Sequence, residues 1–481
     1  MKLSLAGKNF ILPGKMQLFL SCIAAGAAAY LAFFCNLQLL QVITIASGLF
    51  LAGLAFKSDK TWIPILFILL PMRGFQLGSV WGAGAIRAGD IFIAYIFLLW
   101  LFKYAHKDKP GNFIRSKLDL FIVLFLVFYM LSLFWSSKID LGLIRVMKFI
   151  RNFCFFLLIR ELFIKDFRDN YKKLVICSMV MGLAVGLVYL FSIFKDVTPL
   201  QFNSLYEKEV LTSIDLGFWR KRITGGGIFL NGASNFLMLS GVFIFGSLVL
   251  AQNKFKRWLK IVLIIFMFSV ASIGTLSRSA MVSVALILVI LLVGNYKINL
   301  KQNKRFFISI VLFFAIVIFS LGVHKLVLKR FVNPFQDGSW AQRVDLAKVA
   351  LKGFWHSPVI GIGPGSNFTW QSLYAEQVAS RVPDNLYLNI LSEVGAVGFL
   401  LFLVIIFLWL ECLIKCMQDR DADIYLRNIC LAIFAFGLSY LLAALISQEF
   451  ESFEAWIMLG ITSAICSIRA RSKELSVQGA S

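Results

Sequence analysis

The sequence predicts an all-α, polytopic helical membrane protein, and three observations support this fold class. Of its 481 residues, 59% are hydrophobic, 49 are Phe, and only 15% are charged. Soluble domains contain nearer a quarter of charged residues. Apolar runs recur along the whole chain, and a bilayer-spanning helix needs about 20 such residues. We therefore expect a single integral membrane domain over residues 1–481, with no soluble appendage and no internal repeat.

The apolar runs predict about 12–14 transmembrane helices. Several of these runs are shorter than 20 residues. The number of spans is twelve or fourteen, depending on whether the runs 61–72 and 455–468 cross the membrane. In chain order the predicted spans are 16–35, 38–56, 61–72, 90–105, 118–136, 147–164, 174–195, 226–251, 258–276, 279–295, 306–323, 396–416, 426–447 and 455–468.

The distribution of lysine predicts the orientation. With the N-terminus inside, nearly every lysine-dense loop is cytoplasmic, as the positive-inside rule requires. These loops are 57–60, 103–117, 160–173, 253–260, 295–305, 415–427 and the tail. The segment Met1–Lys15 then serves as an uncleaved signal anchor. We expect a multi-pass protein of the bacterial inner membrane whose chemistry lies on the periplasmic face.

Charge and cysteine content exclude other classes. The net charge of +23 fits lysine-rich loops beside anionic lipid headgroups, so we expect membrane lipids and no nucleic acid as partners. The eight cysteines lie mostly inside apolar runs and form no C-x-x-C pair. They predict small buried hydrophobes, with neither a disulfide framework nor a metal site.

The predicted periplasmic side contains a smaller loop, 196–225, and a large loop, 324–384, which precedes the last three spans. Long connections are uncommon and often functional. Within the large loop, Trp340 to Phe354 has helical spacing, with Val344, Leu346, Ala347, Ala350, Leu351 and Phe354 on one side and Arg343, Lys348 and Lys352 among the polar positions. This pattern predicts a partly helical loop with an amphipathic helix at the membrane surface.

Arginines are concentrated on this side, which should be poor in positive charge. They are Arg73, Arg87, Arg220, Arg222, Arg278, Arg343 and Arg381. Guanidinium groups bind phosphate oxygens in a bidentate way. A pyrophosphate at the membrane surface is therefore the ligand that this distribution favours.

Two motifs around these arginines are candidate anion sites. Arg220-Lys221-Arg222 precedes Gly225-Gly226-Gly227 and a predicted helix start, which is typical of an anion nest; a flexible interfacial loop is the alternative. Asn231 and Asn235 lie four residues apart in the apolar run that follows, and buried amides need partners.

The second motif, Ser277-Arg278-Ser279, separates two apolar runs. Its hydroxyls and guanidinium suit a phosphate oxygen, and an arginine snorkelling to the interface is the alternative.

Two further motifs lie in and after the large loop. Ser357–Asn367 alternates Gly and Pro, which predicts a rigid, turning connector rather than a catalytic loop. In Pro383-Asp384-Asn385, Asp384 is placed to act as a helix N-cap or as a general base. Glu393 lies in the apolar continuation; intramembrane acids are functional candidates, and a salt bridge to an arginine is the alternative.

With these motifs the chain resembles the O-antigen polymerase and ligase superfamily, multispan glycosyltransferases that use polyprenyl-diphosphate sugars. Four features match in the family's order, most clearly between about Lys221 and Ile446. They are the stretch from Arg222 to Asn235, the turn at Arg278, the loop with Arg343, Trp355 and Gly361–Gly365, and the helix entry at Asp384 before three terminal spans.

One position departs from the ligase pattern. Ligases of this family carry a His-Asn type pair, nine residues, and then Gly-x-x-Gly. Here Asn385, Gly395 and Gly398 keep that spacing, but Asp384 occupies the histidine position. Polymerase-type members often resemble this form, so polymerisation is favoured over ligation to a lipid A core.

The resemblance implies an inverting, metal-independent transfer from an undecaprenyl-diphosphate-linked oligosaccharide to a glycan acceptor, with a chain-length regulator as a candidate partner. It implies catalytic roles for Asp384 as base and for Arg278 and Arg222 on the diphosphate. The candidate substrate-binding residues are Arg220, Asn231, Asn235, Arg343, Arg381, Asn385 and Glu393. No metal ion is expected, because the outer face has no Asp-x-Asp pair or histidine cluster, and no cofactor is expected. A transporter for lipid-linked oligosaccharides is the alternative of another class, although transporters often show repeated halves.

Overall fold

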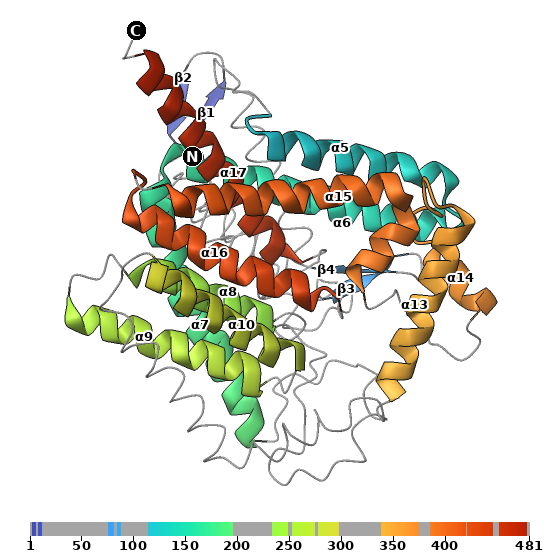
Figure 1. Ribbon diagram of the computed structural model, residues 1–481, viewed down its shortest axis with the longest axis horizontal. Helices are drawn as coiled ribbons and strands as arrows, with labels where there is room; N and C mark the ends of the chain where they lie inside the picture. Colours follow the sequence, from blue (N-terminus) through green and yellow to red (C-terminus); the bar gives the residue numbers. More distant parts are fainter. Residues whose placement is uncertain are drawn as a thin grey trace.

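The computed structural model describes residues 2–5, 8–11, 76–80, 84–87, 114–195, 233–248, 253–274, 278–297, 338–374, 385–419, 421–445 and 452–478. The predicted spans 16–35, 38–56, 61–72, 90–105 and 306–323 lie outside these residues. The described part is dominated by helices, which confirms the predicted all-α class (Figure 1).

The helices are α5 (Lys117–Leu131), α6 (Ile139–Lys165), α7 (Phe167–Lys195), α8 (Ala233–Gly246), α9 (Lys254–Ser269), α10 (Arg278–Lys297), α13 (Gly338–His356), α14 (Asn367–Tyr374), α15 (Leu386–Gln418), α16 (Ile424–Ala443) and α17 (Phe453–Gln478). A 3-10 turn (Ser132–Trp135) follows α5, and a π-helical turn (Val270–Gly274) follows α9.

Two short antiparallel hairpins, which the sequence analysis did not predict, accompany the helices. Strand β1 (Lys2–Leu5) pairs with β2 (Lys8–Ile11), and β3 (Gln76–Val80) pairs with β4 (Gly84–Arg87). The second hairpin falls in the glycine-rich stretch 73–87, where glycine lowers helix propensity and permits a tight turn.

Among the described residues, five helical segments are long and apolar enough to cross a membrane. They are Lys117–Trp135, Phe167–Leu187, Leu386–Gln418, Ile424–Ala443 and Phe453–Ala470. The doubtful run 455–468 is therefore part of a full-length helix, α17. These segments are those of a polytopic membrane protein.

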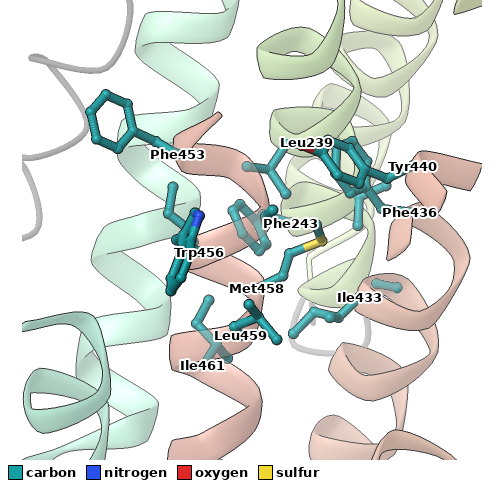
Figure 2. Close-up of a cluster of buried hydrophobic side chains, with 14 of the residues drawn as sticks. Leu239, Phe243, Ile433, Phe436, Tyr440, Phe453, Trp456, Met458, Leu459 and Ile461 are labelled. Atoms are coloured by element: carbon teal, nitrogen blue, oxygen red, sulfur yellow. The ribbon is translucent and has the colours of Figure 1, made fainter. Parts of the chain in front are cut away.

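Aromatic and aliphatic side chains fill the contacts between the helices. Helix α17 packs along α6, α16 packs against α8 and α10, and α15 packs against α5. Figure 2 shows Phe243 of α8, Phe436 of α16 and Met458 of α17 in one buried cluster. Lipid offers no hydrophobic drive for association, so close van der Waals contact has to hold such helices together. At Gly437 a Cβ would lie only 2.6 Å from the Trp409 ring, so α15 and α16 approach closely there.

The bundle has two ends with different polar contacts. Ser136, Asn385 and Ala444 lie at one end, which we call the site end. There, Leu386 N donates to Ala444 O at 2.9 Å. The opposite end, the far end, has a buried ion pair in which Arg160 contacts Asp119 at 2.8 Å. Glu161 accepts from Arg160 and from Arg115 at 2.8 Å each. These contacts tie α5 to α6.

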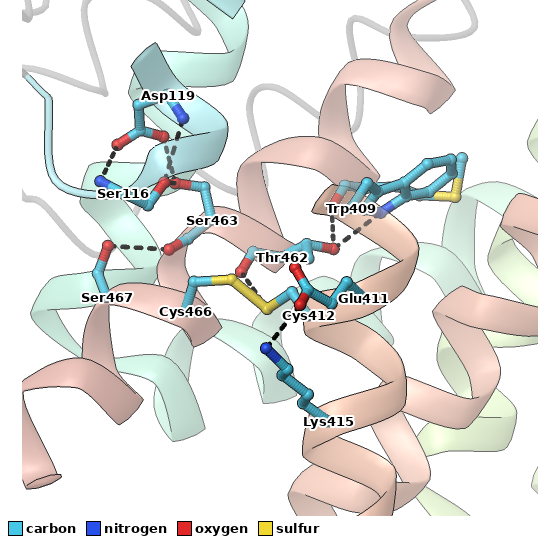
Figure 3. The surroundings of a disulfide bond; sticks show 11 residues. Ser116, Asp119, Trp409, Glu411, Cys412, Lys415, Thr462, Ser463, Cys466 and Ser467 are labelled. Atoms are coloured by element: carbon cyan, nitrogen blue, oxygen red, sulfur yellow. Dashed lines mark hydrogen bonds and ion pairs between the residues drawn. A yellow bond between two sulfur atoms is a disulfide. The ribbon is translucent and has the colours of Figure 1, made fainter. Parts of the chain in front are cut away.

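A disulfide between Cys412 and Cys466 joins α15 to α17 near the far end (Figure 3). The prediction that the cysteines form no disulfide is therefore wrong for this pair, because the packing of α15 on α17 brings together residues that are 54 apart in sequence. The cysteines at 154, 177, 416 and 430 are unpaired and at least partly buried, as predicted for small hydrophobes. Within the described ranges, no group of three or more His, Cys, Asp or Glu could hold a metal ion.

Candidate functional site

Helix α15 is interrupted at Gly395, whose φ of 63° and ψ of −168° are not helical. A break of this kind leaves backbone donors and acceptors without helical partners, and these groups must be satisfied elsewhere. The segment Ser357–Ser366, which we call the glycine loop, supplies the missing hydrogen-bond partners. Ile362 N and Gly363 N donate to Ser392 O and Glu393 O at 2.9 Å each. Ala396 N and Val397 N donate to Pro358 O and Val359 O at 2.8 and 3.2 Å.

This contact requires glycine on both sides of it. Gly361 has a φ of 76°, and a Cβ added there would lie 2.4 Å from Glu393 O. A Cβ added at Gly395 would lie 2.4 Å from Val359 O. Backbone therefore meets backbone at a separation that other residues do not allow. The predicted turning path of this loop is confirmed, and its rigidity stays a prediction.

Glu393 is the charged residue at the centre of the break and is only 1% exposed. Its carboxylate forms an ion pair with Arg145 of α6. Tyr129 OH donates to Oε2 at 2.9 Å, and Gly365 N donates to Oε1 at 3.1 Å. A buried carboxylate is tolerated when it is paired and hydrogen-bonded in this way. The salt bridge left open by the sequence analysis is therefore present, but its partner, Arg145, was not among the predicted arginines.

Amides and hydroxyls extend this network beside the glycine loop. Asn389 Oδ1 accepts from Asn367 Nδ2 at 2.9 Å and from Arg145 Nη1 at 3.5 Å. Asn367 Nδ2 also lies 3.1 Å from Ser392 Oγ. Ser136 Oγ, just after the 3-10 turn that follows α5, donates to Pro364 O at 2.8 Å. The connection between α5 and α6 and the residues of α15 around its break therefore hold the glycine loop.

The entry to α15 is fixed by Asn385. Its Oδ1 accepts from Leu388 N at 3.0 Å, which makes Asn385 the N-cap. The capping role considered for Asp384 thus falls to the next residue, and Asp384 itself lies outside the described residues. Because residues four apart share a helix face, Asn385, Asn389 and Glu393 form a polar stripe down the first half of α15.

The other predicted site residues are distributed over several elements. Arg278 is the first residue of α10, so the predicted interruption between two apolar helices is confirmed. Arg343 is half-buried on α13, and Asn235 is 5% exposed on α8. Arg220, Arg222, Asn231 and Arg381 lie outside the described residues. The convergence of Arg222, Arg278 and Asp384 on one cavity therefore stays a prediction.

Sequence reasoning missed Arg145 and Tyr129. Both lie in or next to predicted spans, and neither belongs to a recognisable motif. Arg145 does carry one signal, since a cation near the start of an apolar helix needs a partner. That signal could have paired it with the one intramembrane acid already singled out, Glu393.

These features define a class: a polytopic helical membrane protein with a buried ionic network at a helix break on one end of its bundle. Residues 262–403 match the family model described as O-antigen ligase. This match confirms the resemblance to the O-antigen polymerase and ligase superfamily, and it covers Arg278, the glycine loop and Glu393. None of the curated proteins compared gives a significant match. The match supports a membrane enzyme of the O-antigen ligase or polymerase type.

Proposed function

We propose that the protein is a glycosyltransferase of surface-polysaccharide assembly that transfers a glycan from an undecaprenyl-diphosphate donor to an acceptor sugar. The observation that carries this proposal is the family match over residues 262–403. Within that segment lie the arginine at the start of α10 and the glycine loop.

The reaction takes place at the periplasmic face of the bacterial inner membrane, which is the site end of the bundle. The glycine loop, which belongs to the predicted periplasmic loop 324–384, lies at this end. Ser136, the last residue of the predicted span 118–136, and Asn385, which directly follows that loop, lie there as well. The loops predicted to be cytoplasmic contribute Arg115 and Glu161, which pair at the far end. This separation supports the alternation of the predicted spans, and the positive-inside rule assigns the site end to the periplasm.

The donor lies with its tail in lipid and its diphosphate at the membrane surface. Arg222 and Arg278 grip the diphosphate and stabilise the charge that develops on the leaving group, which is often the largest catalytic contribution. Arg278 opens a 20-residue helix, α10, and a helix N-terminus adds positive potential at that point.

Asp384 takes the proton from the acceptor hydroxyl as general base. The hydroxyl attacks opposite the leaving diphosphate and inverts the anomeric centre. Arg343 and Arg381 hold the acceptor or the second phosphate, and Arg220, Asn231, Asn235 and Asn385 line the substrate site. The guanidinium groups supply the charge stabilisation, so no step needs a metal ion.

Glu393 acts by positioning rather than by touching the substrate. Its carboxylate is almost fully buried and has three partners, namely Arg145, Tyr129 and the backbone of Gly365. It fixes the half-helix whose first residues follow Asp384. The direct substrate contact expected from the sequence is therefore the less favoured role.

Polymerisation is favoured because Asp384 stands where ligases of the family carry histidine. Ligation onto a lipid A core is the second candidate, and the description of the matching family as O-antigen ligase favours it. A flippase for lipid-linked oligosaccharides is the alternative of another class.

Removal of the protein distinguishes these functions through the lipid-linked glycans that accumulate. A polymerase predicts single repeats on the polyprenyl carrier at the periplasmic face, whereas a ligase predicts long polymer on that carrier. Mass spectrometry of extracted lipid-linked glycans measures this difference. Accumulation at the cytoplasmic face alone would contradict both and favour a flippase.

A further inference from the structure

Helix α13 has two apolar faces, and the buried one packs inside the protein. Leu346, Val349 and Ala350 are at most 2% exposed, and α13 contacts α14 and α15. The prediction placed Leu346 and Ala350 on a face lying against the membrane. For these two residues it is wrong, because they are buried inside the protein.

The second face is exposed and lies on another side of the helix. Val344, Leu351 and Trp355 are spaced seven and four residues apart, so they share one side, and Trp355 is 74% exposed. Lys348 lies on the same side and contacts Asp345 at 3.2 Å. The exposed apolar surface continues past the helix through Val359 and Ile360 at the tip of the glycine loop.

The break in α15 locates the membrane boundary relative to this surface. The second half of α15 runs over the 23 residues from Ala396 to Gln418. At 1.5 Å per residue this half-helix is about 34 Å long, enough to cross the roughly 30 Å hydrocarbon core by itself. The bilayer surface at the site end therefore lies close to Gly395.

The glycine loop meets α15 at this level. Val397 N donates to Val359 O at 3.2 Å, and Val397 and Leu400 are themselves 39% and 60% exposed in the first turns of the spanning half-helix. In Figure 1, α13 crosses the ends of α5 and α15 at a steep angle to both. Val359, in the exposed apolar surface that follows α13, therefore lies beside the exposed first turns of the spanning half-helix.

We propose that Leu351, Trp355, Val359 and Ile360 form a lipid wedge that enters the membrane leaflet at the site end, beside α15. Phospholipid acyl chains cover these four side chains. Lys348 and Lys352 extend to the phosphate groups of the same lipids, as long cationic side chains do at an interface. Tryptophan prefers this depth as well. The wedge thus holds the glycine loop on the helix break from the lipid side.

The wedge can be tested independently of any catalytic activity by photo-crosslinking. Trp355 or Ile360 is replaced with p-benzoylphenylalanine in the full-length protein, which is placed in nanodiscs of phosphatidylethanolamine and phosphatidylglycerol. His356 is the matched control, since it is exposed on the adjacent side of α13, with its ring 5.0 Å from that of Trp370. After irradiation, mass spectrometry measures the yield of lipid adducts in monodisperse protein.

We expect adduct yields at positions 355 and 360 to exceed the yield at 356 by about tenfold, because only the wedge reaches the acyl region. Equal yields at all three positions would overturn the proposal. So would crosslinks from 355 and 360 to a second copy of the chain, because that copy would then cover the face. Two labelled positions are used so that a folding defect at one does not remove the test.

Discussion

Replacement of Arg278 with alanine is expected to abolish long glycan chains while the protein still inserts normally. Arg278 begins α10 after the π-helical turn, at the membrane surface in the proposed orientation. Loss of one preorganised donor to a developing negative charge typically costs about 10²–10³ in rate. Gel analysis of the surface polysaccharide reports the loss as a collapsed chain-length ladder.

The controls for this prediction separate charge from geometry. Arg278→Lys keeps the charge but loses the bidentate fork, so partial activity is expected. Lys254→Ala removes an exposed cation at the start of α9, and the ladder should be unchanged. Arg222→Ala should reproduce the loss seen with Arg278→Ala. Normal ladders in both alanine variants, at normal protein levels, would refute the proposed diphosphate grip.

Glu393→Ala is expected to lower the free energy of unfolding by about 3–5 kcal/mol, because it leaves Arg145 buried without its counter-ion. Tyr129 OH and Gly365 N lose their acceptor in the same variant. The glycine loop should then detach from the helix break. Thermal unfolding in lipid–detergent micelles measures the stability of the protein. The rate of limited proteolysis within 357–366 measures how far the glycine loop has detached.

Glu411→Ala is the matched control on the same helix. Glu411 pairs with Lys415, whose side chain is 65% exposed, and such pairs contribute about 0.3–0.5 kcal/mol. The double variant Arg145→Met/Glu393→Gln removes both buried charges and should recover much of the lost stability. If the Glu393→Ala variant unfolds at a temperature no lower than that of Glu411→Ala, the ionic network does not stabilise the helix break at Gly395.

Hydropathy predicted much of the described fold because a bilayer dictates the length and composition of its spans. The run 396–416 corresponds closely to the second half-helix of α15, which ends at Gln418. The helix entry expected at Asp384 corresponds to the start of α15 at Leu386, but the break at Gly395 was not predicted, since the apolar sequence runs straight into the span. The hairpins and the Cys412–Cys466 disulfide also escaped prediction, because both depend on chain pairings that periodicity does not encode.

The site was partly predictable from the sequence, because charged residues are rare in segments that cross a bilayer. An acid within an apolar run stands out in sequence, and Glu393 was singled out that way. Its partner, Arg145, carried only the general signal of a cation near the start of an apolar helix, and the packing of α6 near α15 was needed to establish the pair. Asn385 was recognised by its motif, whereas its capping role needed the backbone geometry at the entry to α15.

The most direct test of the proposed transfer uses the purified protein in liposomes that contain a polyprenyl-diphosphate oligosaccharide and an acceptor. We predict a new glycosidic bond and one polyprenyl diphosphate released for each bond formed, with both lost in Arg278→Ala. Movement of the donor across the bilayer without any glycosidic product would contradict the account.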